Sequence, residues 1–289
     1  MNAVVSERTM DEEQFFLHFP RKQNDAWKGT YGKLLLINGS MGMAGAAMLN
    51  LLGAKTIGAS YIIDALPAAI YPLVATRFMT PVFHPLTSEN WHAEITSLMA
   101  DTHVTAYGSG VTRMADKRAI LDLLLQESKH PLVLDAEALR LLHHNAFVLR
   151  FARCPVILTP HIGEFHSFCA IDSHAQAHDL QTDALFFAQT YHVYIVLKGP
   201  HTVVASPDGC IYKNKTGNQA LAQAGSGDLL TGMIGAMLTF VPDIMTAVTM
   251  AVWAHGYLAQ IGSKTHAMQN FDLSIYPQLM DQLFFKHGL

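Results

Sequence analysis

The chain has 289 residues, and with 50% of them hydrophobic it can form the core of one large α/β domain or two small ones. A formal net charge of −4, with scattered lysines, lacks the basic excess of nucleic-acid-binding proteins and favours a small-molecule partner. Three widely spaced cysteines without a CxxC pair, no signal peptide and no apolar run of about 18 residues exclude a disulfide framework and a membrane protein, and predict a soluble cytoplasmic one.

The first residues, 1–25, are polar and are expected to form an N-terminal arm. They contain an aromatic cluster, Phe15, Phe16 and Phe19, followed by Pro20. These apolar side chains are expected to hold the arm against the body of the protein.

Short apolar runs rich in β-branched residues then alternate with longer segments of helical period. The strands are expected at 33–38, 60–65, 103–107, 131–135, 155–159 and 194–198. Several of these runs are apolar at consecutive positions, which is typical of strands covered on both faces. The pattern predicts an α/β fold with a mainly parallel central sheet between two layers of helices.

After residue 198 the pattern changes to two short strand-like runs joined by a turn at Pro207, Asp208 and Gly209. The sheet is therefore expected to end in a few antiparallel strands at one edge. Helices are expected at 227–240, 243–261 and 268–285. Because no repeat or linker divides the chain, residues 1–289 are expected to form a single domain.

The first glycine-rich loop follows the strand at 33–38 and carries Gly39, Gly42 and Gly45. With the strand that ends in Asp64, it imitates a dinucleotide-binding fingerprint. However, the spacing is GxxGxxG and not GxGxxG, so a tight turn onto a pyrophosphate is not specified. The small residues 44–47 offer a floor for a ligand, or simply allow a helix to pack closely on the sheet.

Two further strand ends carry weaker signals. YGSGV (107–111) brings glycines to the end of one strand, where backbone approaches a ligand or merely turns. PLVLDAEAL (131–139) ends the next strand in Asp135 and Glu137, which suit ribose hydroxyls or the cap of a following helix.

LTPHIGEF (158–165) follows the strand at 155–159 and places His161 and Glu164 at the carboxyl edge of the sheet. The imidazole can contact a substrate, and the carboxylate can organise a hydrated magnesium ion. The same residues also resemble a capped helix start, and the sequence leaves both interpretations open.

VLKGPHT (196–202) ends a buried strand in Lys198 and Gly199. Lys198 is placed to meet a phosphate or a ribose, with Thr202 and nearby amides adding hydrogen bonds. A solvated lysine at a strand end is the alternative.

AGSGD (224–228) is the strongest signal. Gly225 and Gly227 flank Ser226 immediately before an apolar helix, so that unhindered amides and the helix dipole can bind an anion. Asp228 is either a helix-capping residue or a general base that takes a proton from a substrate hydroxyl. The two glycines favour the second interpretation because a cap requires neither of them.

Sixteen histidines raise the question of zinc, and His174 and His178 are four residues apart. No glutamate follows His174 as in HExxH, and no third ligand is suggested, so zinc is not expected.

Taken in order, the blocks KGTYGKLLLINGS, MAGAA, YGSGV, LDAEAL, LTPHIGE, VLKGPHT, TGNQALAQAGSGDLLTGMIGAML and AVWAHG resemble the ADP- or ATP-dependent NAD(P)H-hydrate dehydratase family. The resemblance runs from about residue 16 to residue 285. It implies a three-layer α/β/α fold of the ribokinase-like superfamily.

The resemblance also implies a reaction, namely nucleotide-driven removal of water from the S form of hydrated NADH or NADPH, with magnesium and either ADP or ATP. It implies that one set of residues contacts the adenine nucleotide: Lys198, Gly199, Pro200, His201, Thr202 and Gly227, beside the amides of Gly225 and Ser226. A second set would contact the hydrated nucleotide: Ala46, Gly110, His161 and Asp228, with Asp228 as proton acceptor. Glu164 is the candidate for a water-mediated contact to magnesium.

The chain departs from the family pattern at two places. It has YGSGV where GPGLG is usual, and NQALA (218–222) where NPGMA is usual. The short arm leaves no room for the epimerase domain that many bacterial relatives carry, so a separate epimerase is expected to act on the same hydrate. Family resemblance also suggests a homo-oligomer, for example a tetramer.

Three other functions remain open on the sequence. A kinase of the same superfamily, acting on a vitamin-precursor alcohol, would use the AGSGD turn and magnesium equally well. A Rossmann dehydrogenase is contradicted by the glycine spacing and leaves AGSGD unexplained. A nucleotide sensor without turnover would fit the two departures, but Asp228 argues against it.

Overall fold

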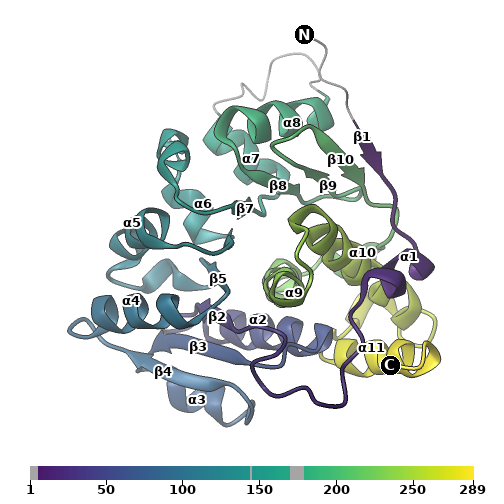
Figure 1. The fold of residues 1–289 in the computed structure, drawn as a ribbon, viewed down its shortest axis with the longest axis horizontal. Coiled ribbons are helices and arrows are strands. Elements are labelled where there is room, and N and C mark those ends of the chain that lie inside the picture. The colour runs from purple at the N-terminus through teal and green to yellow at the C-terminus, as the bar shows by residue number, and fades with distance from the viewer. Residues whose placement is uncertain (1–5, 144, 170–178) are drawn as a thin grey trace.

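The computed structural model describes residues 6–143, 145–169 and 179–289, and a ten-stranded sheet runs through its middle (Figure 1). The strands lie in the order β1-β10-β9-β8-β7-β6-β5-β2-β3-β4. Their bounds are β1 Ser6–Arg8, β2 Leu34–Ile37, β3 Ile62–Pro67, β4 Val82–Leu86, β5 Val104–Tyr107, β6 Leu132–Leu134, β7 Val156–Leu158, β8 Tyr194–Leu197, β9 Val203–Ala205 and β10 Cys210–Lys213.

The sheet is parallel from β8 to β4, and β9 is antiparallel to both β8 and β10. All six predicted parallel strands are present, and the predicted antiparallel edge is confirmed. Two strands were not predicted. β4 contains Pro85, which weakens the strand signal, and β1 is three polar residues that pair with β10.

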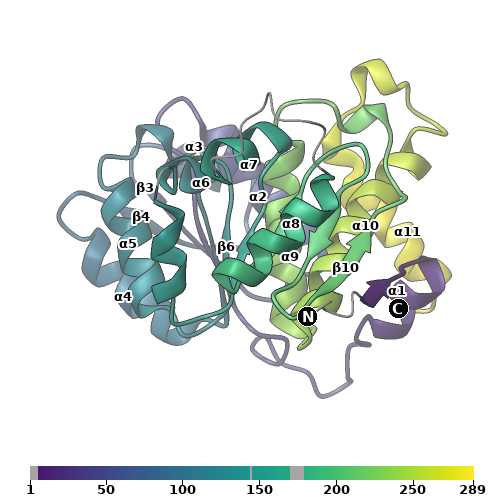
Figure 2. The same ribbon diagram turned by 90° about the horizontal axis from the view of Figure 1, so that it is seen from above.

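Helices cover both faces of the sheet, which makes three layers (Figure 2). Leu34 and Leu36 face one layer, while Leu35 and Ile37 on the same strand face the other. The first layer contains α1 Glu12–His18, α2 Ala44–Ile57, α3 Tyr71–Ala75, α9 Ser226–Phe240, α10 Ile244–Gly262 and α11 Tyr276–Lys286. The second contains α4 Trp91–Asp101, α5 Lys117–Glu127, α6 Glu137–Leu141, α7 Ile162–Cys169 and α8 Leu180–Tyr191.

Five short 3-10 turns complete the described elements: Val111–Arg113, Ala146–Phe151, Gln219–Leu221, Met268–Asn270 and Leu273–Ile275. Within the described residues, no helix combines the length and the apolarity needed to cross a membrane. His174 and His178 lie outside the described residues.

The prediction of one helix over 268–285 is wrong in its first half, where two 3-10 turns precede α11. The carboxylate of Asp272 accepts a hydrogen bond from the amide of Ser274 and starts a separate turn. Pro277, which has no N–H, then lies in the first turn of α11, a position that favours a helix start over a helix interior.

The N-terminal arm packs against the body through its aromatic residues, as expected. Phe15 is fully buried, and its ring lies 5.1 Å from that of Trp253. Beside it, the carboxylate of Glu12 accepts hydrogen bonds from Lys286 (2.6 Å) and His287 (2.7 Å) near the C-terminus. Burial opposes ionisation of Glu12, but these hydrogen bonds and one from the hydroxyl of Tyr257 lower its pKa to about 2.

Two glycines let α2 and α9 pack backbone to backbone. A Cβ atom on Gly53 would lie 2.0 Å from the carbonyl oxygen of Leu229, and one on Gly232 would lie 2.0 Å from that of Asn50. Only glycine fits such an approach. The contact brings the start of α9 close to residues of α2, and this is where the candidate site lies.

Candidate active site

A cavity of about 840 Å³ opens at the carboxyl ends of β6 and β8, beside the start of α9. Ligands of open α/β sheets bind at this edge. Ten of the sequence-predicted site residues line it: His161, Lys198, Gly199, Pro200, His201, Thr202, Gly225, Ser226, Gly227 and Asp228. The fold thus gathers three turns that are far apart in the sequence.

The turn before α9 has the backbone geometry of an anion site. Gly225 is the N-cap residue, with φ of 90°, and a Cβ atom there would lie 2.3 Å from a methyl carbon of Leu49. A Cβ atom on Gly227 would lie 3.0 Å from Nζ of Lys198. Both glycines therefore keep the helix start open, so that its amides and its dipole can meet a negative charge together with the lysine ammonium.

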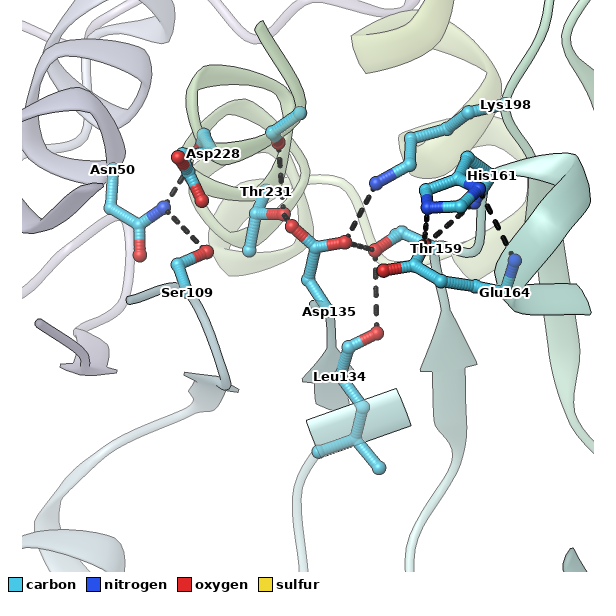
Figure 3. Close-up of polar contacts among 11 residues, drawn as sticks. Asn50, Ser109, Leu134, Asp135, Thr159, His161, Glu164, Lys198, Asp228 and Thr231 are labelled. Atoms are coloured by element: carbon cyan, nitrogen blue, oxygen red, sulfur yellow. Dashed lines mark hydrogen bonds and ion pairs between the residues drawn. The ribbon is translucent and has the colours of Figure 1, made fainter. Parts of the chain in front are cut away.

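Lys198 is held by a buried carboxylate, Asp135, at the end of β6. Its Nζ donates to Oδ1 of Asp135 over 2.8 Å, and the hydroxyls of Thr159 (2.7 Å) and Thr231 (2.8 Å) donate to the same carboxylate (Figure 3). Burial alone would raise the pKa of Asp135, but Lys198 and the two hydroxyls hold it below its ordinary value. Asp135 thus stays ionised and fixes the ammonium beside Gly227.

Asp228 lies in the first turn of α9, not at its N-cap position, which Gly225 occupies. Burial and the nearby charge of Asp135 raise the pKa of Asp228 to about 6, while a hydrogen bond from Ser109 and the charge of Lys198 oppose this rise. A carboxylate with a pKa near neutrality is suited to accept a proton and to release it again. This environment favours the general-base interpretation over a plain helix cap.

His161 and Glu164 form the reciprocal contacts of a helix start. The amide of His161 donates to Oε2 of Glu164 (2.9 Å), and the amide of Glu164 donates to Nδ1 of His161 (3.2 Å). The helix-start interpretation therefore describes both residues at the beginning of α7. The His161 side chain is 61% exposed, so its ring remains accessible at the mouth of the cavity.

Three predicted residues, Glu164, Ala46 and Gly110, do not line the cavity. Ala46 and Gly110 lie against each other. A Cβ atom on Gly110, whose φ is 69°, would lie 2.7 Å from that of Ala46. Between this contact and Asp228 lies Asn50, whose Nδ2 donates to Oγ of Ser109 (3.1 Å) and to the main-chain oxygen of Asp228 (2.7 Å) (Figure 3). Asn50 thus connects Asp228 to Ser109, the neighbour of Gly110 in the chain.

The departures from the family pattern have local structural support. In YGSGV, Tyr107 is buried and its hydroxyl donates to the carbonyl of Lys117 (2.6 Å). In NQALA, Asn218 caps the turn Gln219–Leu221 by accepting from the amide of Ala220 (3.0 Å). The chain around both segments is therefore ordered by its own side chains.

Several polar residues of the site were not identified from the sequence. Asn50 and Thr231 stand among apolar residues in the middle of helical segments, and Ser109 stands between two glycines. A polar residue at an otherwise apolar position was the only available signal. His255 is also buried at the cavity, with its Nε2 3.2 Å from Oγ of Ser226. Burial lowers the pKa of His255 to about 4, so it is neutral at pH 7.

Among the described residues, no three histidine, cysteine, aspartate or glutamate side chains come together as a metal site. Asp64, the acid of the dinucleotide-type pattern, is fully buried inside the sheet layer and cannot reach a ribose. The dehydrogenase interpretation therefore lacks the acid that it requires.

Comparison with known proteins gives one consistent family. The family model described as NAD(P)H-hydrate dehydratase matches residues 34–277. The chain is 34% identical to the ADP-dependent (S)-NAD(P)H-hydrate dehydratase of Bacillus subtilis, and the match covers 89% of this chain and 90% of that one. It also matches bifunctional NAD(P)H-hydrate repair enzymes, such as that of Gloeobacter violaceus at 35% identity, and spans about half (48%) of the length of that protein.

Solved structures of similar proteins indicate the same family and the same fold. The B. subtilis ADP/ATP-dependent NAD(P)H-hydrate dehydratase, co-crystallized with ATP and Mg²⁺, superposes with a TM-score of 0.84 at 30% identity, covering 98% of this chain and 99% of that one. A ribokinase-like superfamily protein of Enterococcus faecalis has a TM-score of 0.86 at 21% identity, covering 97% and 96% of the two chains. The second match concerns the fold alone, and it confirms the expected ribokinase-like architecture.

Proposed function

Because the chain belongs to the NAD(P)H-hydrate dehydratase family, we propose that it removes water from the S form of hydrated NADH or NADPH and consumes ADP or ATP in doing so. The product is the reduced nicotinamide nucleotide, so the activity is that of a lyase that repairs a damaged metabolite. The named relatives support this function over phosphorylation of a vitamin-precursor alcohol.

One observation of the site carries the proposal: an anion-binding helix start and a carboxylate with a raised pKa share one cavity. Gly225 and Gly227 leave the amides at the start of α9 open, and Lys198 adds a fixed positive charge. Asp228 lies in the first turn of the same helix. A polyphosphate bound at the amides would therefore lie beside a group that can take a proton.

The proposed reaction has two steps. Asp228 accepts the proton of the hydroxyl on the hydrated nicotinamide ring as that oxygen attacks the terminal phosphorus of the nucleotide. Phosphate then leaves with the C–O bond electrons, and loss of a ring proton forms the C=C bond of the reduced nucleotide. Phosphorylation converts a poor leaving group into a good one, which explains why a dehydratase needs a nucleotide.

The binding roles are proposed by position. The nucleotide would be held by residues from two turns, Lys198 to Thr202 and Gly225 to Gly227. The hydrate would lie toward Ala46 and Gly110, on the side of Asp228 that faces Asn50. His161, exposed at the mouth of the cavity, would also contact the hydrate.

Magnesium fits this site as a companion of the nucleotide. Mg²⁺ commonly binds through one or two carboxylates, several waters and the phosphates of a substrate, so it needs no complete protein cage. Glu164, 16% exposed behind His161, is the carboxylate proposed to contact it through water. When bound, the metal would neutralise phosphate charge during transfer.

The direct test is incubation with freshly prepared hydrated NADH, magnesium and either ADP or ATP. Return of the absorbance of reduced nicotinamide, with release of inorganic phosphate in equal amount, is expected. A reaction without nucleotide is the control. Stable phosphorylated alcohol with no reduced nicotinamide would indicate a kinase, and tight NAD binding without a nucleotide requirement would indicate a dehydrogenase.

Three further properties belong to the proposal. The relatives that combine repair activities in one chain support a separate epimerase that supplies the S form. We also expect one catalytic domain per chain, and a homo-oligomer such as a tetramer. The place of action is expected to be the cytoplasm, where the repaired nucleotides are used.

A further inference from the structure

Asp64 is a fully buried acid that the proposed reaction does not use. It lies in β3, where it pairs in register with Leu36 of β2 and Phe83 of β4. Neither of its carboxylate oxygens receives a hydrogen bond from the described residues, and the same is true of Oδ1 of Asn38. Asn38 follows β2 and lies two residues beyond Leu36, on the same face of the sheet as Asp64.

The contact between Asp228 and Asn50 determines which atoms donate and which accept in the hydrogen bonds near Asp64. The main-chain oxygen of Asp228 can only accept, so the group of Asn50 that meets it at 2.7 Å must be the NH₂ group. Oδ1 of Asn50 therefore faces Asn38 and can also only accept. The contact of 3.2 Å between the two side chains then requires the NH₂ group of Asn38.

This orientation leaves Oδ1 of Asn38 without a donor unless Asp64 carries a proton. An unpartnered buried amide oxygen beside an ionised buried carboxylate would place two acceptors together, which is costly in an apolar layer. A carboxylic acid at Asp64 supplies the missing donor. Burial raises the pKa of Asp64 well above its usual range, and the neighbouring Asn38 side chain offsets only part of this rise.

The other branch of these contacts reaches the carboxylate of Asp228. Nδ2 of Asn50 donates to Oγ of Ser109 over 3.1 Å, so the hydroxyl proton of Ser109 is free for another acceptor. Ser109 hydrogen-bonds the Asp228 carboxylate and lowers its pKa. Asn50 thus fixes the main chain of Asp228 directly (Figure 3). It fixes the side chain of Asp228 through Ser109.

We propose that Asp64 is a positioning residue whose neutral carboxylic acid donates to Asn38 and sets the direction of a buried relay, Asp64–Asn38–Asn50–Ser109, that holds Asp228. All four residues of the relay are at most 1% exposed. The effect on turnover rests on the proposed function. The proton on Asp64 does not, and the experiment separates the two.

The first measurement is the infrared spectrum at pH 8, which needs no turnover. Wild-type protein is expected to show the carbonyl band of a protonated carboxylic acid, and Asp64→Asn is expected to lack it. At this pH Asp228, with a pKa of about 6, is ionised and does not contribute. A spectrum without such a band, or a band that survives in Asp64→Asn, would overturn the proposal.

The second measurement compares pH dependences of stability. Ionisation of a buried acid destabilises the folded state, and no charged group acts on the pKa of Asp64 to offset this. The unfolding equilibrium constant of wild type, relative to that of Asp64→Asn, should therefore rise up to about tenfold per pH unit between the ordinary carboxyl pKa and the raised one. A ratio independent of pH would contradict a proton on Asp64.

The third measurement tests positioning through the pH profile of kcat. Asp64→Asn keeps a donor for Asn38 and should keep kcat within a few-fold, whereas Asp64→Leu and Ser109→Ala remove links of the relay. In the pH profile of kcat, the fall at low pH is set by the pKa of Asp228, which lies next to Asp135 and Lys198. Without the Ser109 hydrogen bond, this fall should move up by about one pH unit. The affinity for ADP should change little.

If the relay had a purely structural role, Asp64→Leu and Ser109→Ala would lower stability without shifting the low-pH fall of kcat. Ser109→Ala, which removes only a hydroxyl, keeps the test valid if Asp64→Leu does not fold. Folded Asp64→Leu and Ser109→Ala enzymes with the wild-type low-pH fall would refute the relay. If no variant and no wild-type protein dehydrates the hydrate, the proposed function fails, while the infrared result still decides whether Asp64 holds a proton.

Discussion

Two influences oppose the ionisation of Asp228, and two favour it. Asp135 and burial hold its pKa up, while Lys198 and Ser109 hold it down. Because Asp135 also fixes Lys198, the two carboxylates and one ammonium form a single electrostatic unit. Lys198 also belongs to the anion site, but the anion-binding amides do not depend on the Asp228 carboxylate, so replacement of Asp228 can distinguish proton transfer from nucleotide binding.

Replacement of Asp228 by asparagine is expected to lower kcat by at least about 100-fold, because general base catalysis contributes this much or more. The dissociation constant for ADP, measured by calorimetry, should stay within a few-fold of wild type because amides and Lys198 build the anion site. Retained turnover in Asp228→Asn would remove this residue from the mechanism. Glu13→Gln, an exposed acid in α1, is the matched control and should not change kcat.

The rate should also depend on pH through the same residue. A base works only when deprotonated, and the pKa of Asp228 is raised to about 6. The kcat/KM for the hydrate should therefore fall about tenfold per pH unit below pH 6 and be level above it. A limb near pH 4 would mean that the base is an ordinary exposed carboxylate.

The sequence predicts which residues form the site better than it predicts which of them bond to one another. The AGSGD and KGPHT turns are identifiable because glycines beside a charged residue at a strand or helix end have few structural reasons to occur. The pairing of Asp135 with Lys198 is not identifiable, since it joins residues 63 positions apart that only the sheet order brings together. The assigned ligand roles remain predictions.

At the scale of elements, α2 and α9 determine where the site residues lie. Their backbones meet at Gly53 and Gly232, and the same contact places Asn50 against the first turn of α9. The sequence shows these glycines inside helical segments, where glycine is unfavourable without a packing reason. It does not show which helix each one meets.

Replacement of Gly232 by alanine should destabilise the protein by about 1–3 kcal/mol, because the added methyl group would lie 2.0 Å from a backbone oxygen that cannot move alone. Urea unfolding measures the effect. Gly45→Ala is the control, since a Cβ atom on Gly45 has no atom within 4 Å, and it should not destabilise the protein. Equal effects of the two substitutions would argue against the close helix contact.

For the molecule as a whole, the N-terminal arm and the C-terminal helix are joined at one place. Phe15 packs against Trp253 of α10, and Glu12 bonds Lys286 of α11. The aromatic cluster was sufficient to predict that the arm packs on the body. The strand β1 was not predictable, because three polar residues carry no strand pattern and gain their place only by pairing with β10.

Phe15→Ala should lower the free energy of unfolding by about 3–5 kcal/mol, as expected for truncation of a fully buried phenylalanine. Leu17→Ala in the same helix removes a side chain that is 78% exposed and should change it by less than about 0.5 kcal/mol. Chemical denaturation monitored by tryptophan fluorescence compares them. If Phe15→Ala is as stable as Leu17→Ala, the arm does not contribute to the core.

The alternation of strands and helices was enough to predict the central parallel strands and the layers, because buried parallel strands leave a strong apolar pattern. The strands at both edges of the sheet were not predicted, for one physical reason. Edge strands often carry residues that hinder pairing with a further strand, and these residues also weaken the strand pattern in the sequence. β4 carries Pro85, and β1 carries the charged residues Glu7 and Arg8.

These two edges also limit how copies of the chain can assemble. A proline at one outer strand and a charged three-residue strand at the other both hinder addition of an eleventh strand from a second molecule. Continuous sheets across subunits, and the fibrous aggregates that grow in the same way, are therefore disfavoured. Subunits of an oligomer would have to meet through helices and loops, which leaves each sheet closed within its own chain.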